Sequence, residues 1–137
     1  MAKILVAEDE ASLREFVQRA LSYHGHEVVA VRDGAEGLHA LVEADPPFDL
    51  LLTDIVMPVM DGIALSLKVA KEFPKLKVLL MTGYAAERQR AHNLDELIFD
   101  VLAKPFTLDE ICERVEQALN APNESIKTTT SDKGLQN

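Results

Sequence analysis

Five side chains that can do polar chemistry each follow a short apolar run in this sequence. They are Glu8, Asp9, Asp54, Thr82 and Lys104. Three carboxylates gathered in a folded protein repel one another and resist ionisation unless a cation joins them. Oxygen ligands without His or Cys suit a hard ion, Mg²⁺ or Mn²⁺. Such a set predicts a metal-dependent reaction in which a carboxylate takes up a phosphoryl group.

Asp54 is the candidate nucleophile of this set. It follows the unbroken apolar run at residues 50–52 and precedes the turn residues Asp61 and Gly62. A carboxylate placed where a buried strand ends and a loop begins is held rigidly and remains reachable from solvent. If Asp54 attacks phosphorus, the metal and Lys104 would neutralise the transferring oxygens, and the Thr82 hydroxyl would hydrogen-bond the product.

Five short apolar runs predict five buried strands with helical segments between them. The strands are expected at residues 4–7, 28–31, 50–52, 77–81 and 98–102. Nearly continuous apolar strands that alternate with helices predict an α/β fold, a doubly wound parallel sheet between two layers of helices. In the flavodoxin-like strand order 2-1-3-4-5, the carboxyl ends of the strands open onto one edge, with the crevice between the first and third strands. The polar side chains would then converge.

Local signals predict where the first and last helices begin. Ser12 with Glu15, and Thr107 with Glu110, have the spacing of a capping box. Gly25 is a natural stop for the first helix. A first helix that begins just after Ser12 and a last one that begins just after Thr107 are therefore expected.

The composition indicates one globular domain. The chain has 137 residues, of which 47% are hydrophobic, and it is long enough to bury a core without disulfides. The domain is expected to span residues 1–120, and the polar tail at residues 121–137 is predicted to be disordered. Cys112, the single cysteine, lies in an apolar helical pattern and is interpreted as a packed core thiol.

The charge balance and the apolar runs argue against several classes of function. Acidic residues outnumber basic ones 23 to 14, and the resulting net charge of -9 disfavours direct nucleic-acid binding. No run approaches the length of a membrane span, and the first apolar run is too short for a signal peptide, which points to the cytoplasm and away from the membrane. The four histidines have no metal-ligand spacing and are interpreted as surface or structural residues.

Four short segments, in this order, resemble the receiver domain of two-component response regulators, the CheY-like superfamily. They are the acidic pair Glu8-Asp9, LLTDIVMPVMDG at residues 51–62, MTG at residues 81–83 and KPF at residues 104–106. The resemblance covers residues 3–119. It implies a signalling protein that catalyses only its own phosphorylation and dephosphorylation, and not an enzyme acting on other substrates.

The resemblance also implies roles for individual residues. Asp54 accepts phosphate from the phosphohistidine of a histidine kinase or a histidine phosphotransferase. Asp9 and Asp54 ligate Mg²⁺ with the Val56 backbone carbonyl, and Glu8 acts mostly through water. The Lys104–Pro105 peptide bond is expected to be cis.

One position departs from the pattern of the family. Many receivers carry an aromatic residue three positions before the Lys-Pro pair, and its inward rotation reports phosphorylation; here that position is Val101. Tyr84, two residues after Thr82, is the nearest aromatic candidate to move on phosphorylation or to gate the site. The alternative is that Tyr84 is a rim residue that tunes access and hydrolysis.

The downstream role has several candidate answers. No output domain is expected after the last helix, so the signal would leave through protein contact at the face of the fourth helix, fifth strand and fifth helix. The segments around Asp54 and Thr82 are also similar to the single-domain, CpdR-like receivers of alphaproteobacteria. Members of that group act as phosphorylation-controlled adaptors for the ClpXP protease, which makes this machinery a candidate partner.

Other functions stay open or are disfavoured. A phosphorelay intermediate or phosphate sink, which would pass the group to a histidine phosphotransferase, is the alternative to an effector-binding switch. A flavodoxin-type binding module is disfavoured because Glu8 and Asp9 would repel the FMN phosphate. A haloacid-dehalogenase-like phosphatase is disfavoured because it needs a second aspartate where Val56 stands.

Overall fold

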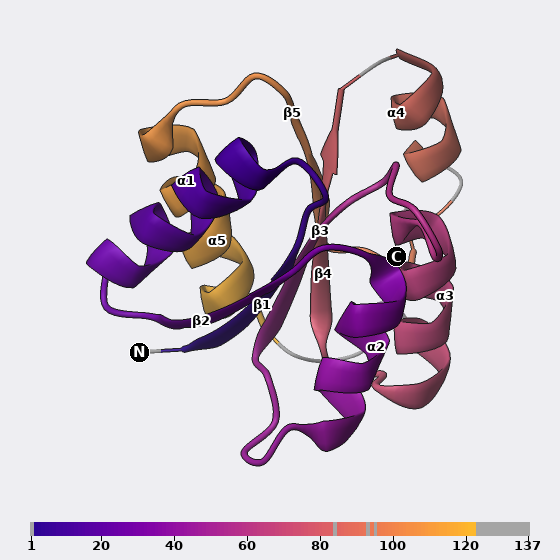
Figure 1. Ribbon diagram of the computed structural model, residues 1–137, viewed down its shortest axis with the longest axis horizontal. Coiled ribbons are helices and arrows are strands. Elements are labelled where there is room, and N and C mark those ends of the chain that lie inside the picture. The colour runs from indigo at the N-terminus through magenta and orange to yellow at the C-terminus, as the bar shows by residue number, and fades with distance from the viewer. Residues whose placement is uncertain (1, 84, 93, 95, 123–137) are drawn as a thin grey trace, which may run out of the picture.

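The computed structural model describes residues 2–83, 85–92, 94 and 96–122. Within these residues the chain alternates strictly between strands and helices (Figure 1). In chain order the elements are β1 Lys3–Ala7, α1 Ala11–Tyr23, β2 Glu27–Val31, α2 Gly34–Glu43, β3 Leu50–Asp54, α3 Gly62–Glu72, β4 Lys77–Thr82, α4 Ala85–His92, β5 Asp100–Ala103 and α5 Leu108–Asn120.

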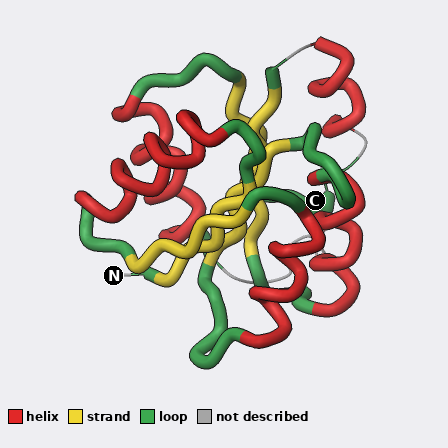
Figure 2. Tube along the Cα trace, in the orientation of Figure 1, coloured by secondary structure: helices red, strands yellow, loops and turns green. Residues whose placement is uncertain are grey.

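The described strands form one parallel sheet in the order β2-β1-β3-β4-β5. Helices α1 and α5 cover one face of this sheet, and α2, α3 and α4 cover the other (Figures 1 and 2). The doubly wound, three-layer α/β fold with the flavodoxin-like order 2-1-3-4-5 is thus confirmed. The strand order reverses between β1 and β3, which pair directly with each other.

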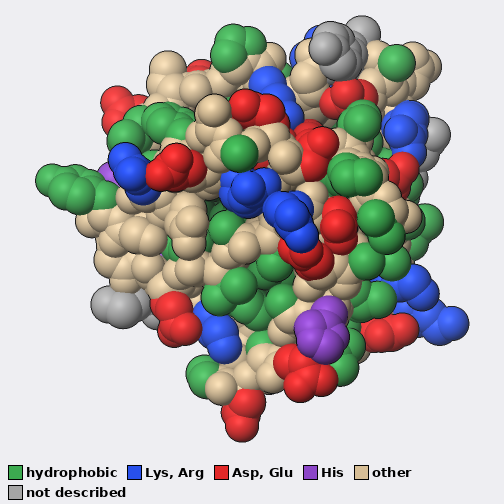
Figure 3. All heavy atoms as spheres, in the orientation of Figure 1, with side chains coloured by type: hydrophobic (Ala, Val, Ile, Leu, Met, Phe, Trp, Pro, Cys, Tyr) green, Lys and Arg blue, Asp and Glu red, His purple; other side chains and the backbone are tan. Residues whose placement is uncertain are grey.

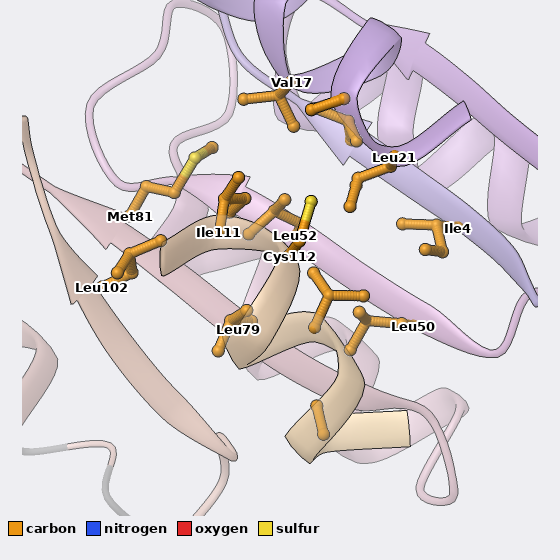
Figure 4. Close-up of a cluster of buried hydrophobic side chains, with 14 residues drawn as sticks. Ile4, Val17, Leu21, Leu50, Leu52, Leu79, Met81, Leu102, Ile111 and Cys112 are labelled. Atoms are coloured by element: carbon orange, nitrogen blue, oxygen red, sulfur yellow. The ribbon is translucent and has the colours of Figure 1, made fainter. Parts of the chain in front are cut away.

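Strand residues alternate between two hydrophobic clusters, one on each face of the sheet. Ile4 and Val6 point to the α1 and α5 side, whereas Leu5 and Ala7 point to the α2 and α3 side. Figure 4 shows the first cluster, in which Cys112 lies among aliphatic side chains of β1, β3, β4, α1 and α5. The prediction of a packed core thiol is confirmed. Burial on both faces explains why the strands read as continuous apolar runs.

The first helix begins earlier than the capping-box pattern predicts. Glu10 is the N-cap of α1, and its side chain accepts the Leu13 N–H at 2.9 Å. The capping box of Ser12 and Glu15 is therefore wrong, because the helix starts directly beyond the β1 loop and Ser12 is already inside its first turn. The second capping box, Thr107 with Glu110, is confirmed at the start of α5.

The fifth strand is shorter at its start than the apolar pattern indicates. Residues 98 and 99 were included in the predicted strand, yet β5 begins at Asp100. Backbone N–H groups of Leu97 and Ile98 donate to the Leu94 carbonyl, so this part of the chain closes a turn instead. Ile98 is buried without being in a strand, and a buried turn residue has the same apolar signature as a strand residue.

Helix α5 ends at Asn120, where the last helix was expected to end. The predicted disordered tail lies almost wholly outside the described residues, which stop at Pro122. None of the described helices is long and apolar enough to cross a membrane. Figure 3 shows acidic and basic side chains interspersed over one face of the molecule.

The loop after β3 is held against the sheet by close backbone contacts. The Gly62 N–H donates to the Ile55 carbonyl at 2.7 Å, and the Gly34 N–H donates to the Met60 carbonyl at 2.9 Å. A Cβ on Gly62 would lie 1.9 Å from the Asp54 carbonyl oxygen. No side chain fits there, so glycine at this position sets how closely α3 approaches the end of β3.

Replacing Gly62 with alanine is expected to lower the free energy of unfolding by at least about 2 kcal/mol, because the added methyl overlaps the Asp54 backbone. The matched change Gly37→Ala brings a Cβ no closer than 3.4 Å to Leu65. It is expected to be neutral or to stabilise α2 by up to about 1 kcal/mol. Urea unfolding measures both variants, and a Gly62→Ala midpoint equal to that of wild type would contradict the close approach.

Candidate functional site

A lysine between two buried carboxylates forms the centre of the site. The Lys104 Nζ lies 3.1 Å from Asp54 Oδ1 and 3.3 Å from Glu8 Oε1. Glu8 follows β1, Asp54 ends β3 and Lys104 follows β5, so three strands of the sheet supply one side chain each. The convergence at the carboxyl edge that the topology requires is present in the structure.

Backbone contacts fix these side chains in place. The Glu8 N–H continues the β1–β2 ladder by donating to the Val31 carbonyl at 3.1 Å, and the Lys104 N–H continues the β4–β5 ladder by donating to the Thr82 carbonyl at 2.7 Å. The Ile55 N–H donates to Asp54 Oδ1 at 2.9 Å. Each functional group is thus held within one residue of a strand end.

Asp54 is more enclosed than the sequence indicates. The residue is 4% exposed, so only a small part of the Asp54 side chain is reachable from solvent. Ile55 and Met57 are buried after it, while Val56 is 52% exposed at the rim. The Gly62 N–H holds the loop against the strand end through the Ile55 carbonyl, and the Ile55 N–H and the Lys104 Nζ contact the carboxylate itself.

Burial dominates the electrostatics of both inner carboxylates. It raises the pKa of Glu8 from its ordinary value of 4.5 to about 7, with a further contribution from the nearby Asp54. Burial also raises the pKa of Asp54, against the opposing effect of Lys104. For Lys104, burial lowers the pKa, but the carboxylates of Asp54 and Glu8 outweigh it and the pKa is raised. One lysine does not fully compensate two desolvated acids.

A divalent cation fits this arrangement. One oxygen each from Glu8, Asp9 and Asp54 lie within 4.8 Å of one another, and Asp9 is exposed at the entrance. Glu8 Oε1 is buried without a hydrogen-bond partner among the described residues, because the Lys104 Nζ approaches it as an ion pair without hydrogen-bond alignment. A buried oxygen whose close cation, Lys104 Nζ at 3.3 Å, makes no aligned hydrogen bond to it, in an all-oxygen donor set, suits a hard ion such as Mg²⁺.

The Thr82 hydroxyl is the second buried group that lacks a partner. Thr82 is 0% exposed, and its Oγ1 has no hydrogen-bond partner among the described residues. A buried hydroxyl without a partner costs free energy. Its presence at the end of β4 therefore favours a ligand that accepts a hydrogen bond there. This is the position predicted for contact with a transferred phosphoryl group.

Glu87 belongs to the same region and was not among the predicted site residues. It lies in the first turn of α4, is 8% exposed, and its Oε1 accepts the Gly83 N–H at 2.8 Å. An acid in the first turn of the helix that follows β4 is a signal in the sequence, but such acids commonly serve the helix dipole alone. Arg90, one turn further, pairs with Asp61 at 2.9 Å.

The remaining predicted positions have different outcomes. The Lys104–Pro105 bond is cis. Val101 is partly buried against the cluster on the α2, α3 and α4 side, and it offers no hydroxyl at the position of the usual aromatic switch. Tyr84, the candidate gate, lies outside the described residues. Of the histidines, His26 is structural, with its ring between the Ala2 N–H and Glu116.

The sequence matches a known family across most of the chain. Residues 4–116 match the family model of the response regulator receiver domain. The chain belongs to the response-regulator receiver family. It is therefore a signalling module of two-component systems, and the predicted relationship to CheY-like receivers is confirmed.

Two curated relatives show how the receiver occurs in other proteins. The chain is 40% identical over 121 residues to the response regulator receiver protein CpdR of Brucella abortus, an alignment that covers 88% of this chain and 99% of CpdR. It is 37% identical over 117 residues to the DNA-binding transcriptional regulator NtrC of Escherichia coli, covering 85% of this chain but 24% of NtrC. The receiver thus stands almost alone in one relative and is a small part of the other.

Solved receivers have the same fold. A response regulator receiver domain protein of Clostridium thermocellum superposes with a TM-score of 0.80 at 28% identity, covering 88% of this chain and 95% of that chain. The response regulator TrrA of Thermotoga maritima, in complex with Mg²⁺ and BeF, superposes with a TM-score of 0.78 at 28% identity, covering 87% and 100%.

The pKa of Glu8 predicts how stability depends on pH in metal-free protein. Because the folded-state pKa is raised, the unfolded chain releases its proton first as the pH rises, and stability is lost between about pH 4.5 and pH 7. Relative to Glu8→Gln, wild type is expected to lose about 3 kcal/mol at most over that range.

Urea unfolding in EDTA at about pH 5 and about pH 8 measures this difference. Glu113→Gln, which removes an exposed carboxylate of α5, is the matched control and should follow wild type. If the stability difference between wild type and Glu8→Gln is the same at both pH values, Glu8 does not titrate in this window.

Proposed function

We propose that this receiver accepts a phosphoryl group on Asp54 and that the modification changes which proteins it contacts. One observation carries the proposal: a buried Asp54 carboxylate lies 3.1 Å from the Lys104 Nζ, and at the end of the neighbouring strand β4 the buried Thr82 hydroxyl has no hydrogen-bond partner among the described residues. A carboxylate close to a cation and to a hydroxyl that is free to donate a hydrogen bond suits a reaction in which the carboxylate gains a group with several anionic oxygens. The donor is the phosphohistidine of a histidine kinase or a histidine phosphotransferase.

In the transfer, one Asp54 carboxylate oxygen forms a bond to phosphorus as the phosphorus–nitrogen bond of the phosphohistidine breaks. The electron pair of the broken bond stays on the imidazole nitrogen, which takes up a proton. Lys104 neutralises the charge on the phosphoryl oxygens, and the Thr82 hydroxyl donates a hydrogen bond to one of them. Because these groups are already held at strand ends, little reorganisation is needed.

Asp9, Asp54 and Glu8 are the residues that would hold Mg²⁺ or Mn²⁺, and the Val56 carbonyl is proposed as a further ligand. When bound, the metal supplies positive charge for the developing phosphoryl oxygens. Its positive charge would also lower the pKa of Asp54, whose carboxylate must be deprotonated to attack. The TrrA structure with Mg²⁺ and BeF supports this assignment by analogy.

Downstream, we propose a switch of protein contacts at the face formed by α4, β5 and α5. Exposed apolar side chains border β5 on both sides: Leu97 and Phe99 precede it, and Leu108 follows it, each with about two fifths of its surface exposed. These exposed side chains are candidate contacts for a protein partner. The likeness to CpdR makes the ClpXP protease machinery the first effector to test, and a phosphorelay to a histidine phosphotransferase is the alternative. A cytoplasmic location stays a prediction.

Phosphorylation at Asp54 is testable with a small phosphoryl donor such as acetyl phosphate and Mg²⁺. The expected result is a mass gain of one phosphoryl group per wild-type molecule, which is lost in Asp54→Ala and in EDTA. Lys104→Ala should slow the reaction by about a hundredfold, the effect of removing one preorganised electrostatic contact. Lys68→Ala removes an exposed lysine of α3 and should react at the wild-type rate. Modification that persists in Asp54→Ala would contradict the assignment.

Affinity capture from a lysate separates the two downstream roles. The baits are wild type, wild type with Mg²⁺ and beryllofluoride, and Asp54→Ala. Retention of the ClpXP machinery by one state and not the other supports the adaptor switch. Recovery of only a kinase and a phosphotransferase in every state would overturn it and favour the relay.

A further inference from the structure

The Glu87 carboxylate takes a backbone donor at the edge of the site. Its Oε1 accepts the Gly83 N–H at 2.8 Å, and the residue is 8% exposed. Gly83 comes directly after Thr82, whose hydroxyl is buried and without a partner in the described part of the chain. The two neighbouring donors therefore differ: the Thr82 hydroxyl donates to no described residue, and the Gly83 N–H already donates to a carboxylate oxygen.

Three observations place this contact beside Asp54 and Lys104. A Cβ built on Gly83 would lie 3.8 Å from Glu87 Oε1 and 3.9 Å from Lys104 Cδ, so Gly83 lies between the two side chains. Among the effects on the pKa of Asp54, in which burial is the largest, repulsion from Glu87 contributes to the rise. The Lys104 N–H donates to the Thr82 carbonyl, which ties the two strand ends together.

We propose that the Glu87 carboxylate holds the Gly83 N–H in the unphosphorylated protein, and that a phosphoryl group on Asp54 displaces it and shifts the first turn of α4. The inference rests on the proposed phosphorylation of Asp54. A phosphoryl group adds about two negative charges and strong acceptor oxygens beside an N–H that serves one anion. Two anions in a desolvated site repel each other, so the carboxylate on the movable helix leaves.

Helix α4 is suited to such a movement. Its described side chains include few apolar ones: Ala91 is buried, whereas Ala86, Arg88 and Gln89 are exposed. Much of its attachment is polar, through Glu87 to Gly83 and through Arg90 to Asp61 at 2.9 Å. Residues three apart lie on the same side of a helix, so both contacts leave α4 on the same side. An element with little apolar burial moves at low cost.

This device would do the work of the missing aromatic switch. Val101 on β5 packs on the side of the sheet that α2, α3 and α4 cover. Its side chain has no polar group that could hydrogen-bond to the Thr82 hydroxyl. Release of Glu87 instead transmits the charge change directly to α4. The surface that changes is then α4 itself, next to the exposed apolar side chains that border β5.

The test uses beryllofluoride with Mg²⁺ as the phosphoryl mimic and amide NMR of the full chain. Saturation is expected to move the Gly83 amide resonance of wild type and to speed hydrogen exchange in α4. Glu87→Ala removes the competitor, so half-saturation should need about tenfold less beryllofluoride, the worth of one charge-assisted hydrogen bond. Glu87→Gln keeps an acceptor without the charge and should fall between the two. Gln89→Ala, an exposed neighbour on α4, should match wild type.

The outcomes distinguish this inference from the proposed function. If wild type and Asp54→Ala respond identically to beryllofluoride, Asp54 is not the acceptor and both proposals fall. If wild type binds at Asp54 but Glu87→Ala and Glu87→Gln half-saturate at the wild-type concentration, the Glu87 displacement is overturned and the acceptor role stands. Should Glu87→Ala not fold, Glu87→Gln and the Gly83 amide of wild type decide: an unmoved Gly83 resonance at saturation overturns the displacement.

Discussion

The ion pair of Lys104 with two buried carboxylates is the interaction on which the rest of the structure depends. Removing Glu8 and Asp54 from water costs free energy. The Lys104 ammonium group, 3.3 Å from Glu8 and 3.1 Å from Asp54, offsets only part of that cost. The raised pKa values of both acids are the sign of this deficit. The site therefore lacks enough positive charge to balance its carboxylates, and among the described residues the Thr82 hydroxyl has no acceptor for a hydrogen bond. A divalent cation would supply the charge, and a phosphoryl group would supply the acceptor.

The fold maintains this costly arrangement by using rigid strand ends. Continuation of the β1–β2 and β4–β5 ladders by one residue places Glu8 and Lys104 without flexible linkers. Gly62 lets α3 and the loop after β3 close over Asp54, at a distance that a single methyl group would prevent. The two hydrophobic clusters on either face of the sheet supply the stability that offsets the desolvated charges.

The other side of the site is less firmly packed. Helix α4 contributes little apolar surface and is attached through Glu87 and Arg90. A rigid acceptor beside a weakly packed helix is a sound basis for a switch, since added charge changes the helix and leaves the sheet intact. Val101, where related receivers carry an aromatic group, makes the polar attachment of α4 the more direct route for the signal.

Much of the fold and most of the central site follow from the sequence itself. Apolar runs buried on both faces, helical spacing between them and polar residues after the runs determine a parallel sheet with Glu8, Asp9, Asp54, Thr82 and Lys104 at one edge. Those features are local, or follow from the handedness and layering rules of parallel sheets. The N-cap of α1 at Glu10 and the turn that replaces the first residues of the predicted fifth strand were not predictable, because competing caps and buried turns give the same local pattern.

Tertiary structure alone decided burial and pairing. Asp54 is 4% exposed, and Gly62, eight positions later in the chain, lies against its backbone carbonyl. Glu87 enters the site because α4 docks where its carboxylate meets the Gly83 N–H. Both depend on contacts between separate elements, and the electrostatic state of a carboxylate is set by the water that those contacts exclude. The sequence therefore determined that the five predicted groups meet at the sheet edge, and the tertiary structure added Glu87 and determined how strongly these groups act on one another.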